Sequence, residues 1–165
     1  MAALAQYIIS DAQNSVTGID FSGLKNKSIL VTGASGLVGT YLLAGLAHVP
    51  RKNRPKKMYV VCQSKPEPHW KEITDIVHAT ILRGDLCDDM FANRLPKADL
   101  IIHASGYAQP GKFMTDPLKT IALNTAVTLK LLEKLKPKGK NRLYVGDMWS
   151  ALKGRSFAEQ TPKQA

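Results

Sequence analysis

The stretch VTGASGLVGT, Val31 to Thr40, places three glycines three residues apart between a strand pattern and a helix pattern. Residues 28–33 form a β-branched apolar run, and residues 37–46 place apolar side chains at helical spacing. In such a turn the first glycine permits the sharp bend, the second lets a pyrophosphate approach the backbone, and the third lets helix and strand pack closely. Free N–H groups at the helix start then face the anion. The stretch predicts a dinucleotide site, the alternative being a glycine-rich turn in an unrelated α/β protein.

Strand and helix patterns alternate along the rest of the chain, which predicts an α/β fold with a parallel sheet. Further strands are expected at 58–63, 79–85, 98–106 and 142–146, with a loop and one helical turn at 65–78. The strongest helix pattern covers 116–135, with Asp116 as N-cap and Pro117 at the first helical position. Residues 1–27 are expected to form a short helix and linker ahead of a dinucleotide-binding domain at 28–165.

Composition and length bound the function classes. The 165 residues are 44% hydrophobic, and no apolar run approaches the roughly 20 residues that span a bilayer. The N-terminus lacks a basic start and is interrupted by polar residues, so a cytoplasmic protein without a membrane partner is expected. Two cysteines, Cys62 and Cys87, and four scattered histidines predict reduced thiols and no metal site.

The net charge of +10 raises the question of a nucleic-acid partner. Two clusters of basic residues stand out, at 51–57 and 130–142, and neither is interleaved with aromatic residues. We interpret both clusters as solvated loops and helix ends and not as nucleic-acid-binding surfaces, so no nucleic acid is expected as partner. The 51–57 loop joins a helix to the following strand, so it should lie opposite the edge where ligands bind.

Four motifs in order resemble the extended short-chain dehydrogenase/reductase family of nucleotide-sugar epimerases, dehydratases and decarboxylases. They are T-G-x-x-G-x-x-G from Thr32, RGDL at 83–86, DLIIHASG at 99–106 and DPLKTIALNTAVTLKLLEKL at 116–135. The last departs from the family's Gly-Thr at Ala126 and Val127. The resemblance covers residues 28 to about 145 and implies a Rossmann-type doubly wound parallel sheet, truncated before the substrate domain.

The resemblance also implies which residues contact the cofactor. Asp85 takes the family position that meets the adenine amino group, His103 lies where the fourth strand lines the ribose and nicotinamide side, and Asn124 matches the family's asparagine. His103 itself is expected to be mainly structural, with contacts made by the backbone there. The full set of candidate cofactor-binding residues is Gly33, Ser35, Gly36, Leu37, Val38, Gly39, Gln63, Ser64, Asp85, Leu86, His103, Ala104, Ser105 and Asn124.

The end of the second strand bears on the choice of dinucleotide. NAD enzymes place an acidic residue there against the ribose 2′-hydroxyl. Here Cys62, Gln63 and Ser64 are uncharged and Lys65 is basic, which leaves NADP open. Because the family leans to NAD, NAD is expected first.

The family's general base is the tyrosine of a Tyr-x-x-x-Lys pair, and none of the five tyrosines here is followed four places on by lysine. Gly146 and Asp147 take the family's serine places, and Ser150 resembles a displaced serine. No catalytic residue is therefore expected in this chain, which resembles the first part of a longer enzyme acting on a nucleotide sugar, inactive alone. The alternative is a non-catalytic NAD(P)-binding or assembly module.

The family also commonly forms a homodimer through the helix at 116–135 and the next helix. Because that next helix is missing here, the exposed apolar flank predicts aggregation or a nonstandard oligomer.

Overall fold

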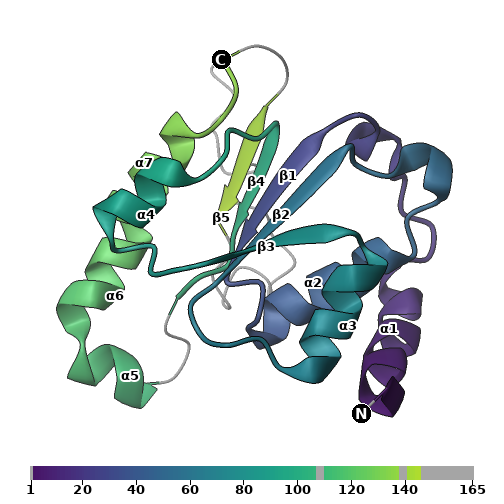
Figure 1. Ribbon diagram of the computed structural model, residues 1–165, viewed down its shortest axis with the longest axis horizontal. Coiled ribbons are helices and arrows are strands. Elements are labelled where there is room, and N and C mark those ends of the chain that lie inside the picture. The colour runs from purple at the N-terminus through teal and green to yellow at the C-terminus, as the bar shows by residue number, and fades with distance from the viewer. Residues whose placement is uncertain (1, 107–109, 138–140, 146–165) are drawn as a thin grey trace, which may run out of the picture.

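A parallel β-sheet forms the centre of the computed structural model, which describes residues 2–106, 110–137 and 141–145 (Figure 1). Its strands lie in the order β3-β2-β1-β4-β5. They are β1 (Ser28–Thr32), β2 (Lys57–Cys62), β3 (Ala79–Arg83), β4 (Leu100–His103) and β5 (Arg142–Val145). All four pairings are parallel. The predicted Rossmann-type sheet is confirmed, and its order reverses between β1 and β4, the switch point at which such sheets bind ligands.

Helices cover both faces of the sheet (Figure 1). One face packs α2 (Leu37–Ala47) and α3 (Pro68–Ile76) around Val31, Val60, Leu43 and Ile73. The other packs α4 (Asp89–Arg94), α6 (Pro117–Asn124) and α7 (Ala126–Glu133), and α5 (Pro110–Thr115) precedes α6. Every residue of β1 is buried, as expected for a strand covered on both faces.

Helix α3 replaces the predicted loop with one helical turn at 65–78. Pro68 takes its first position, and Trp70, Ile73 and Thr74 are its buried residues. The flanking prolines and charged residues hid this short amphipathic pattern in the sequence. Strand β3 also ends at Arg83, two residues before the predicted end, because the chain turns away at Gly84.

The helix predicted over 116–135 is divided at Thr125, whose φ of −120° and ψ of −78° separate α6 from α7. Asp116 does cap the start, accepting from the Lys119 N–H at 3.1 Å. The hydroxyls of Thr120, Thr125 and Thr128 each donate to the carbonyl four residues earlier, at 2.9, 2.7 and 3.2 Å. Such bonds bend helices, which is the physical reason for the division.

The first residues of the chain join the main core. Helix α1 (Ala2–Val16) buries Ala5, Ile8 and Ala12 against α2 and α3. The Tyr41 hydroxyl donates to Asp11 at 3.0 Å, which also ties α1 to α2. The predicted domain boundary at residue 27 stays a prediction.

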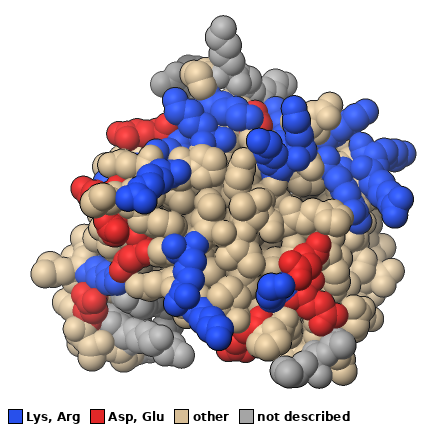
Figure 2. Space-filling view, viewed as in Figure 1, with Lys and Arg blue, Asp and Glu red and all other residues tan. Residues whose placement is uncertain are grey.

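Lys and Arg side chains gather over the amino ends of the strands, toward the top of Figure 2. The 51–57 loop contains a short 3₁₀ helix, Arg51–Asn53, and leads directly into β2. The Lys56 N–H donates to the Lys27 carbonyl at 2.8 Å, so the loop lies beside the start of β1. This cluster is therefore at the end of the sheet opposite the predicted cofactor edge, as expected.

Apolar side chains are exposed along α6 and α7. Leu118 is 79% exposed and has Ile121 one turn further along α6, while Leu129 and Leu132 are exposed one turn apart on α7. The homodimer implied by the resemblance stays a prediction. None of the helices in the described ranges is long and apolar enough to span a bilayer.

Asp99 fixes the amino ends of β1 and β4. Its Oδ2 accepts from the Ser28 N–H at 2.7 Å, the Ser28 hydroxyl at 2.6 Å and the Lys136 ammonium at 2.6 Å. Burial alone would raise the pKa of Asp99, but the hydrogen bonds from Lys136 and Ser28 hold this pKa well below its ordinary value. The ionised carboxylate is thus part of the folded structure.

We therefore expect Asp99→Asn to lower the free energy of unfolding at pH 7 by about 2 kcal/mol. Because the folded pKa of Asp99 lies below the unfolded pKa of about 4, its contribution is complete above that pH and is lost as pH falls. Urea unfolding at pH 7 and at pH 3 should show that the free energies of unfolding of wild type and variant differ less at pH 3. Asp75→Asn removes an exposed carboxylate paired with Lys71 and should change little. A constant difference across this pH range would contradict the assignment.

Candidate functional site

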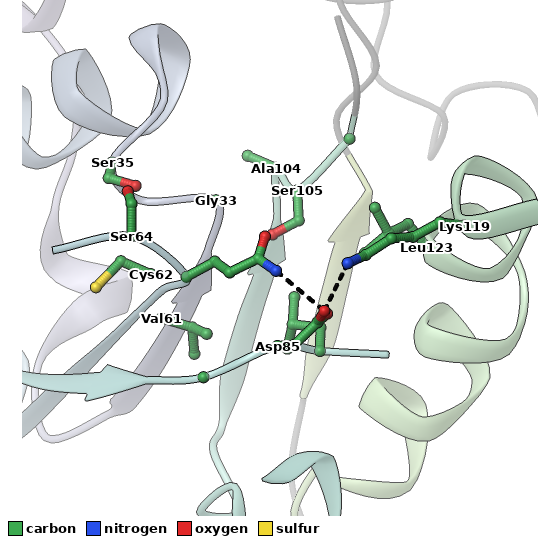
Figure 3. Close-up of a pocket in the computed structure, with 14 residues that line it drawn as sticks. Gly33, Ser35, Val61, Cys62, Ser64, Asp85, Ala104, Ser105, Lys119 and Leu123 are labelled. Atoms are coloured by element: carbon green, nitrogen blue, oxygen red, sulfur yellow. Dashed lines mark hydrogen bonds and ion pairs between the residues drawn. The ribbon is translucent and has the colours of Figure 1, made fainter. Parts of the chain in front are cut away.

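A pocket of about 440 Å³ opens at the carboxyl ends of the strands, where the sheet order reverses (Figure 3). Its lining comes from the turn after β1, the end of β2, the segment after β3, the segment after β4, and α6. The lining residues are Gly33, Ser35, Val61, Cys62, Gln63, Ser64, Gly84, Asp85, Leu86, Ala104, Ser105, Gly106, Lys119 and Leu123.

The glycine turn supports one wall of this pocket. Gly33 has a φ of +67°, and an added Cβ there would lie 2.3 Å from the Ala104 carbonyl oxygen. A Cβ on Gly39 would lie 2.3 Å from the Gly33 carbonyl oxygen, so α2 rests directly on the turn. Gly36 is exposed, and its added Cβ would meet only the Gly33 carbonyl oxygen, at 3.3 Å. Gly33 and Gly39 therefore serve close packing, while Gly36 leaves the backbone open to solvent.

Helix α2 presents free backbone donors beside the pocket. Its hydrogen-bond ladder starts with the Thr40 N–H, which donates to the Gly36 carbonyl at 2.8 Å. The N–H groups of Leu37, Val38 and Gly39 precede this ladder, and the N-cap residue Gly36 has no side chain to cap them. With the helix dipole, these donors form an anion site. Leu37 and Val38 leave their apolar side chains 78% and 53% exposed.

Trp70 of α3 supports the glycine turn through a hydrogen bond. This residue was not identified from the sequence. Its side chain is buried, and its indole Nε1 donates to the Ala34 carbonyl at 2.6 Å. Helix α3 thereby fixes the backbone of the turn through a direct hydrogen bond. The signal available in the sequence was a lone tryptophan three residues before Ile73, at helical spacing.

Asp85 is the centre of a polar cluster that crosses the pocket (Figure 3). Its Oδ2 accepts from Gln63 Nε2 at 3.0 Å and from Lys119 Nζ at 2.6 Å. Its Oδ1 accepts from the Cys87 N–H at 3.0 Å. Burial would raise the pKa of Asp85, but the bonds from Lys119 and Cys87 outweigh it and lower the pKa. The carboxylate is therefore ionised and fixed, with Oδ1 free to accept one more donor such as an adenine amino group.

His103 lies behind the pocket as a buried structural residue. Its Nε2 is 3.0 Å from the Leu123 carbonyl oxygen, which can only accept, so Nε2 carries the proton. Burial lowers the pKa of His103, so the ring is neutral and Nδ1 accepts from the Thr32 hydroxyl at 2.6 Å. These two hydrogen bonds join β1, β4 and α6, which agrees with the structural role expected for His103.

The structure brings together many of the candidate residues. Gly33, Ser35, Gln63, Ser64, Asp85, Leu86, Ala104 and Ser105 line the pocket, and Gly36, Leu37, Val38 and Gly39 form the adjoining helix start. Asn124 does not line it: the side chain is exposed and donates to the Thr120 carbonyl at 2.8 Å, and Leu123 faces the pocket instead. The cofactor contacts themselves stay predictions.

Several lining residues were not anticipated. Lys119 and Leu123 come from α6 and Gly84 from the end of the β3 segment, while Cys62, discussed for the ribose position but left out of the candidate set, ends β2. No group of three or more potential metal ligands occurs in the described part of the chain. Tyr107, Gly146, Asp147 and Ser150, which the sequence analysis considered, lie outside the described residues.

Known proteins resemble both the sequence and the fold. UDP-glucose 4-epimerase of Streptococcus mutans serotype c is 30% identical over 110 residues, which are 64% of this chain and 31% of that protein. An epimerase structure from Methanothermobacter thermautotrophicus has a TM-score of 0.51 at 24% identity and covers 77% of this chain and 34% of its own. The Bordetella bronchiseptica enzyme WbmF, in complex with NADH, has a TM-score of 0.50 at 22% identity, covering 75% and 36%.

The chain thus spans about a third of the length of these relatives. The two structural likenesses show the fold. A family profile, described as NAD dependent epimerase/dehydratase family, matches residues 29–147, which include the glycine turn, the Asp85 cluster and the five strands apart from Ser28. By this match, the chain belongs to the NAD-dependent epimerase/dehydratase family.

Proposed function

We propose that this chain is the dinucleotide-binding part of an enzyme that transfers hydride between a nicotinamide dinucleotide and a hydroxyl of a nucleotide sugar. The observation that carries the proposal is the start of α2, where three unpaired N–H groups stand beside an open pocket at the switch point of the sheet. UDP-glucose 4-epimerase, the sequence relative, is named for a nucleotide sugar, which supports that substrate class.

The pocket residues fit the parts of a dinucleotide. The N–H groups of Leu37, Val38 and Gly39 would hold the pyrophosphate, because these donors have no partner in the helix ladder. Asp85 would accept from the adenine amino group through Oδ1, while Gln63 and Lys119 keep it in place. Ala104 and Ser105 would line the path toward the nicotinamide. When bound, the nicotinamide supplies the hydride acceptor and donor.

The proposed cofactor is a nicotinamide dinucleotide, and the family description supports NAD as one that binds. The NADH bound to the structural relative WbmF agrees with it.

We further propose that this chain alone binds the cofactor without turning over a sugar, because no Tyr-x-x-x-Lys pair occurs in it. The same absence favours the second candidate, a binding or assembly module. A Tyr-x-x-x-Lys pair elsewhere in the same protein would support the enzyme, and inactivity of the complete protein would support the module.

Calorimetric titration of NAD into the chain tests the binding claim. We expect saturable binding with a dissociation constant between about 1 μM and 1 mM. Gly36→Val should abolish it with little loss of stability, because the extended backbone at this N-cap tolerates valine but the side chain would cover the open turn. Gly23→Val, where nothing lies within 4 Å of an added Cβ, is the matched control. Binding that survives in Gly36→Val, or none in wild type, would refute the proposal.

A further inference from the structure

The end of the pocket lined by Gln63, Ser64 and Asp85 is where the adenosine would lie, and it is called the adenosine end below. At this end, β2 is not followed by the acidic residue that selects for a free ribose hydroxyl. Strand β2 ends at Cys62, and the next residues, Gln63 and Ser64, line the pocket without charge. An acidic residue at this place would repel a phosphate on the ribose 2′-oxygen as well as bind the hydroxyl. The nearest alternative carboxylate, Asp85, is neutralised by Lys119 at 2.6 Å.

Arg83 does not itself line the pocket, but it brings a positive charge beside this end of it from the neighbouring strand. Arg83 pairs with Cys62 in the β2–β3 register, and its Nε donates to the Gln63 carbonyl at 3.4 Å. Among the described residues no carboxylate pairs with Arg83, so the terminal nitrogens of its guanidinium remain available. Burial raises the pKa of Cys62, and the charge of Arg83 opposes that rise, so its field reaches the end of β2.

The surroundings of Arg83 add to its charge. Lys65 follows Ser64, is exposed and pairs with no carboxylate in the described part of the chain. The acidic residue that comes next, Glu67, is 76% exposed and lies 3.4 Å from His69. The hydroxyls of Ser35 and Ser64 also border the pocket and can donate to an anion. The adenosine end is therefore a neutral to positive surface with free donors.

We propose that this end of the pocket accepts a 2′-phosphate held by Arg83, so that the protein binds NADP at least as tightly as NAD. The proposal rests on the dinucleotide function above and deepens it. The planar guanidinium offers paired N–H donors that match phosphate oxygens, and such bonds are stronger than those between neutral groups. A ribose hydroxyl would use only the neutral donors and acceptors of Gln63 and Ser64.

The test compares ligands that differ only at the ribose. Dissociation constants of NAD, NADP, adenosine 2′,5′-bisphosphate and adenosine 3′,5′-bisphosphate are measured for wild type, Arg83→Gln and Lys52→Gln. The two bisphosphates carry equal charge, so their comparison removes the effect of the net charge of the chain. Lys52 lies in the 51–57 loop at the opposite end of the sheet, so Lys52→Gln controls for loss of one positive charge. Arg83 is exposed, so Arg83→Gln should fold, and unfolding curves of the variant check this.

We expect wild type to bind NADP no more weakly than NAD and to prefer the 2′,5′ over the 3′,5′ isomer. Arg83→Gln should raise the dissociation constant of NADP about tenfold and leave that of NAD within about twofold, whereas Lys52→Gln should preserve both preferences. Equal binding of the two isomers, tighter binding of NAD, or preferences that persist in Arg83→Gln would overturn the assignment while leaving the dinucleotide site intact. Failure of all four ligands to bind would instead reject the proposed function, and this inference with it.

Discussion

Gly33→Ala is expected to destabilise the chain by about 3 kcal/mol or more. Two costs add at this position. The left-handed φ of +67° costs an alanine roughly 1–2 kcal/mol. The new Cβ would also lie 2.3 to 2.6 Å from backbone atoms of Ala104 and Ser105. These are backbone atoms, so β1 and β4 must separate at their carboxyl ends to relieve the contact.

Urea unfolding measures this effect, with Gly36→Ala as the control from the same motif. Gly36 has a φ of −75°, and its added Cβ would approach only the Gly33 carbonyl oxygen, at 3.3 Å. We expect Gly36→Ala to cost less than about 1 kcal/mol. Equal losses for the two variants would show that the glycines matter only for backbone flexibility and not for packing.

Trp70→Phe is expected to lower the free energy of unfolding by about 2 kcal/mol, and Trp70→Ala by about 4 kcal/mol. The phenylalanine keeps most of the buried volume but removes the donor to the Ala34 carbonyl, which is then left without its 2.6 Å hydrogen bond. The alanine adds a cavity beneath the glycine turn. Both variants should also weaken NAD binding, although Trp70 does not line the pocket.

Chemical unfolding and calorimetry on the same samples separate these two consequences. His69→Phe serves as the control, because the neighbouring His69 is only half-buried and its Nδ1 lies 3.4 Å from Glu67. A Trp70→Phe variant with wild-type stability and wild-type affinity for NAD would show that the indole hydrogen bond does not hold the turn.

The β1–turn–α2 unit was predictable because its information is local. The β-branched run and the three glycines act within a dozen residues: Gly33 makes the predicted bend, with a φ of +67°, and Gly39 allows the predicted close packing. Strand positions followed from apolar runs for the same reason. The division at Thr125 was not predictable from apolar spacing, which continues through it, because the bend depends on hydroxyl bonds to the backbone.

The polar contacts of the site depend on tertiary structure. Lys119 and Asp85 are 34 residues apart and meet only because the fold brings α6 next to the segment that follows β3. Asn124 shows the reverse case: its motif matched, but the turn of α6 directs Leu123 to the pocket and leaves Asn124 outside. Motif matching identified the segment, and the helix phase decided which residue of it faces the pocket.

The neutral state of His103 has an electrical consequence for the site. With the imidazole uncharged, the formal charges among the described lining residues are those of Asp85 and Lys119, which cancel. A pyrophosphate would therefore be attracted by oriented peptide dipoles at short range and not by mobile ammonium or guanidinium groups. Hydrogen bonds from the backbone to the pyrophosphate lose less strength in added salt than contacts that depend on the charge of exposed side chains, so raising the ionic strength should weaken whatever is held at the ribose more than the core of the dinucleotide.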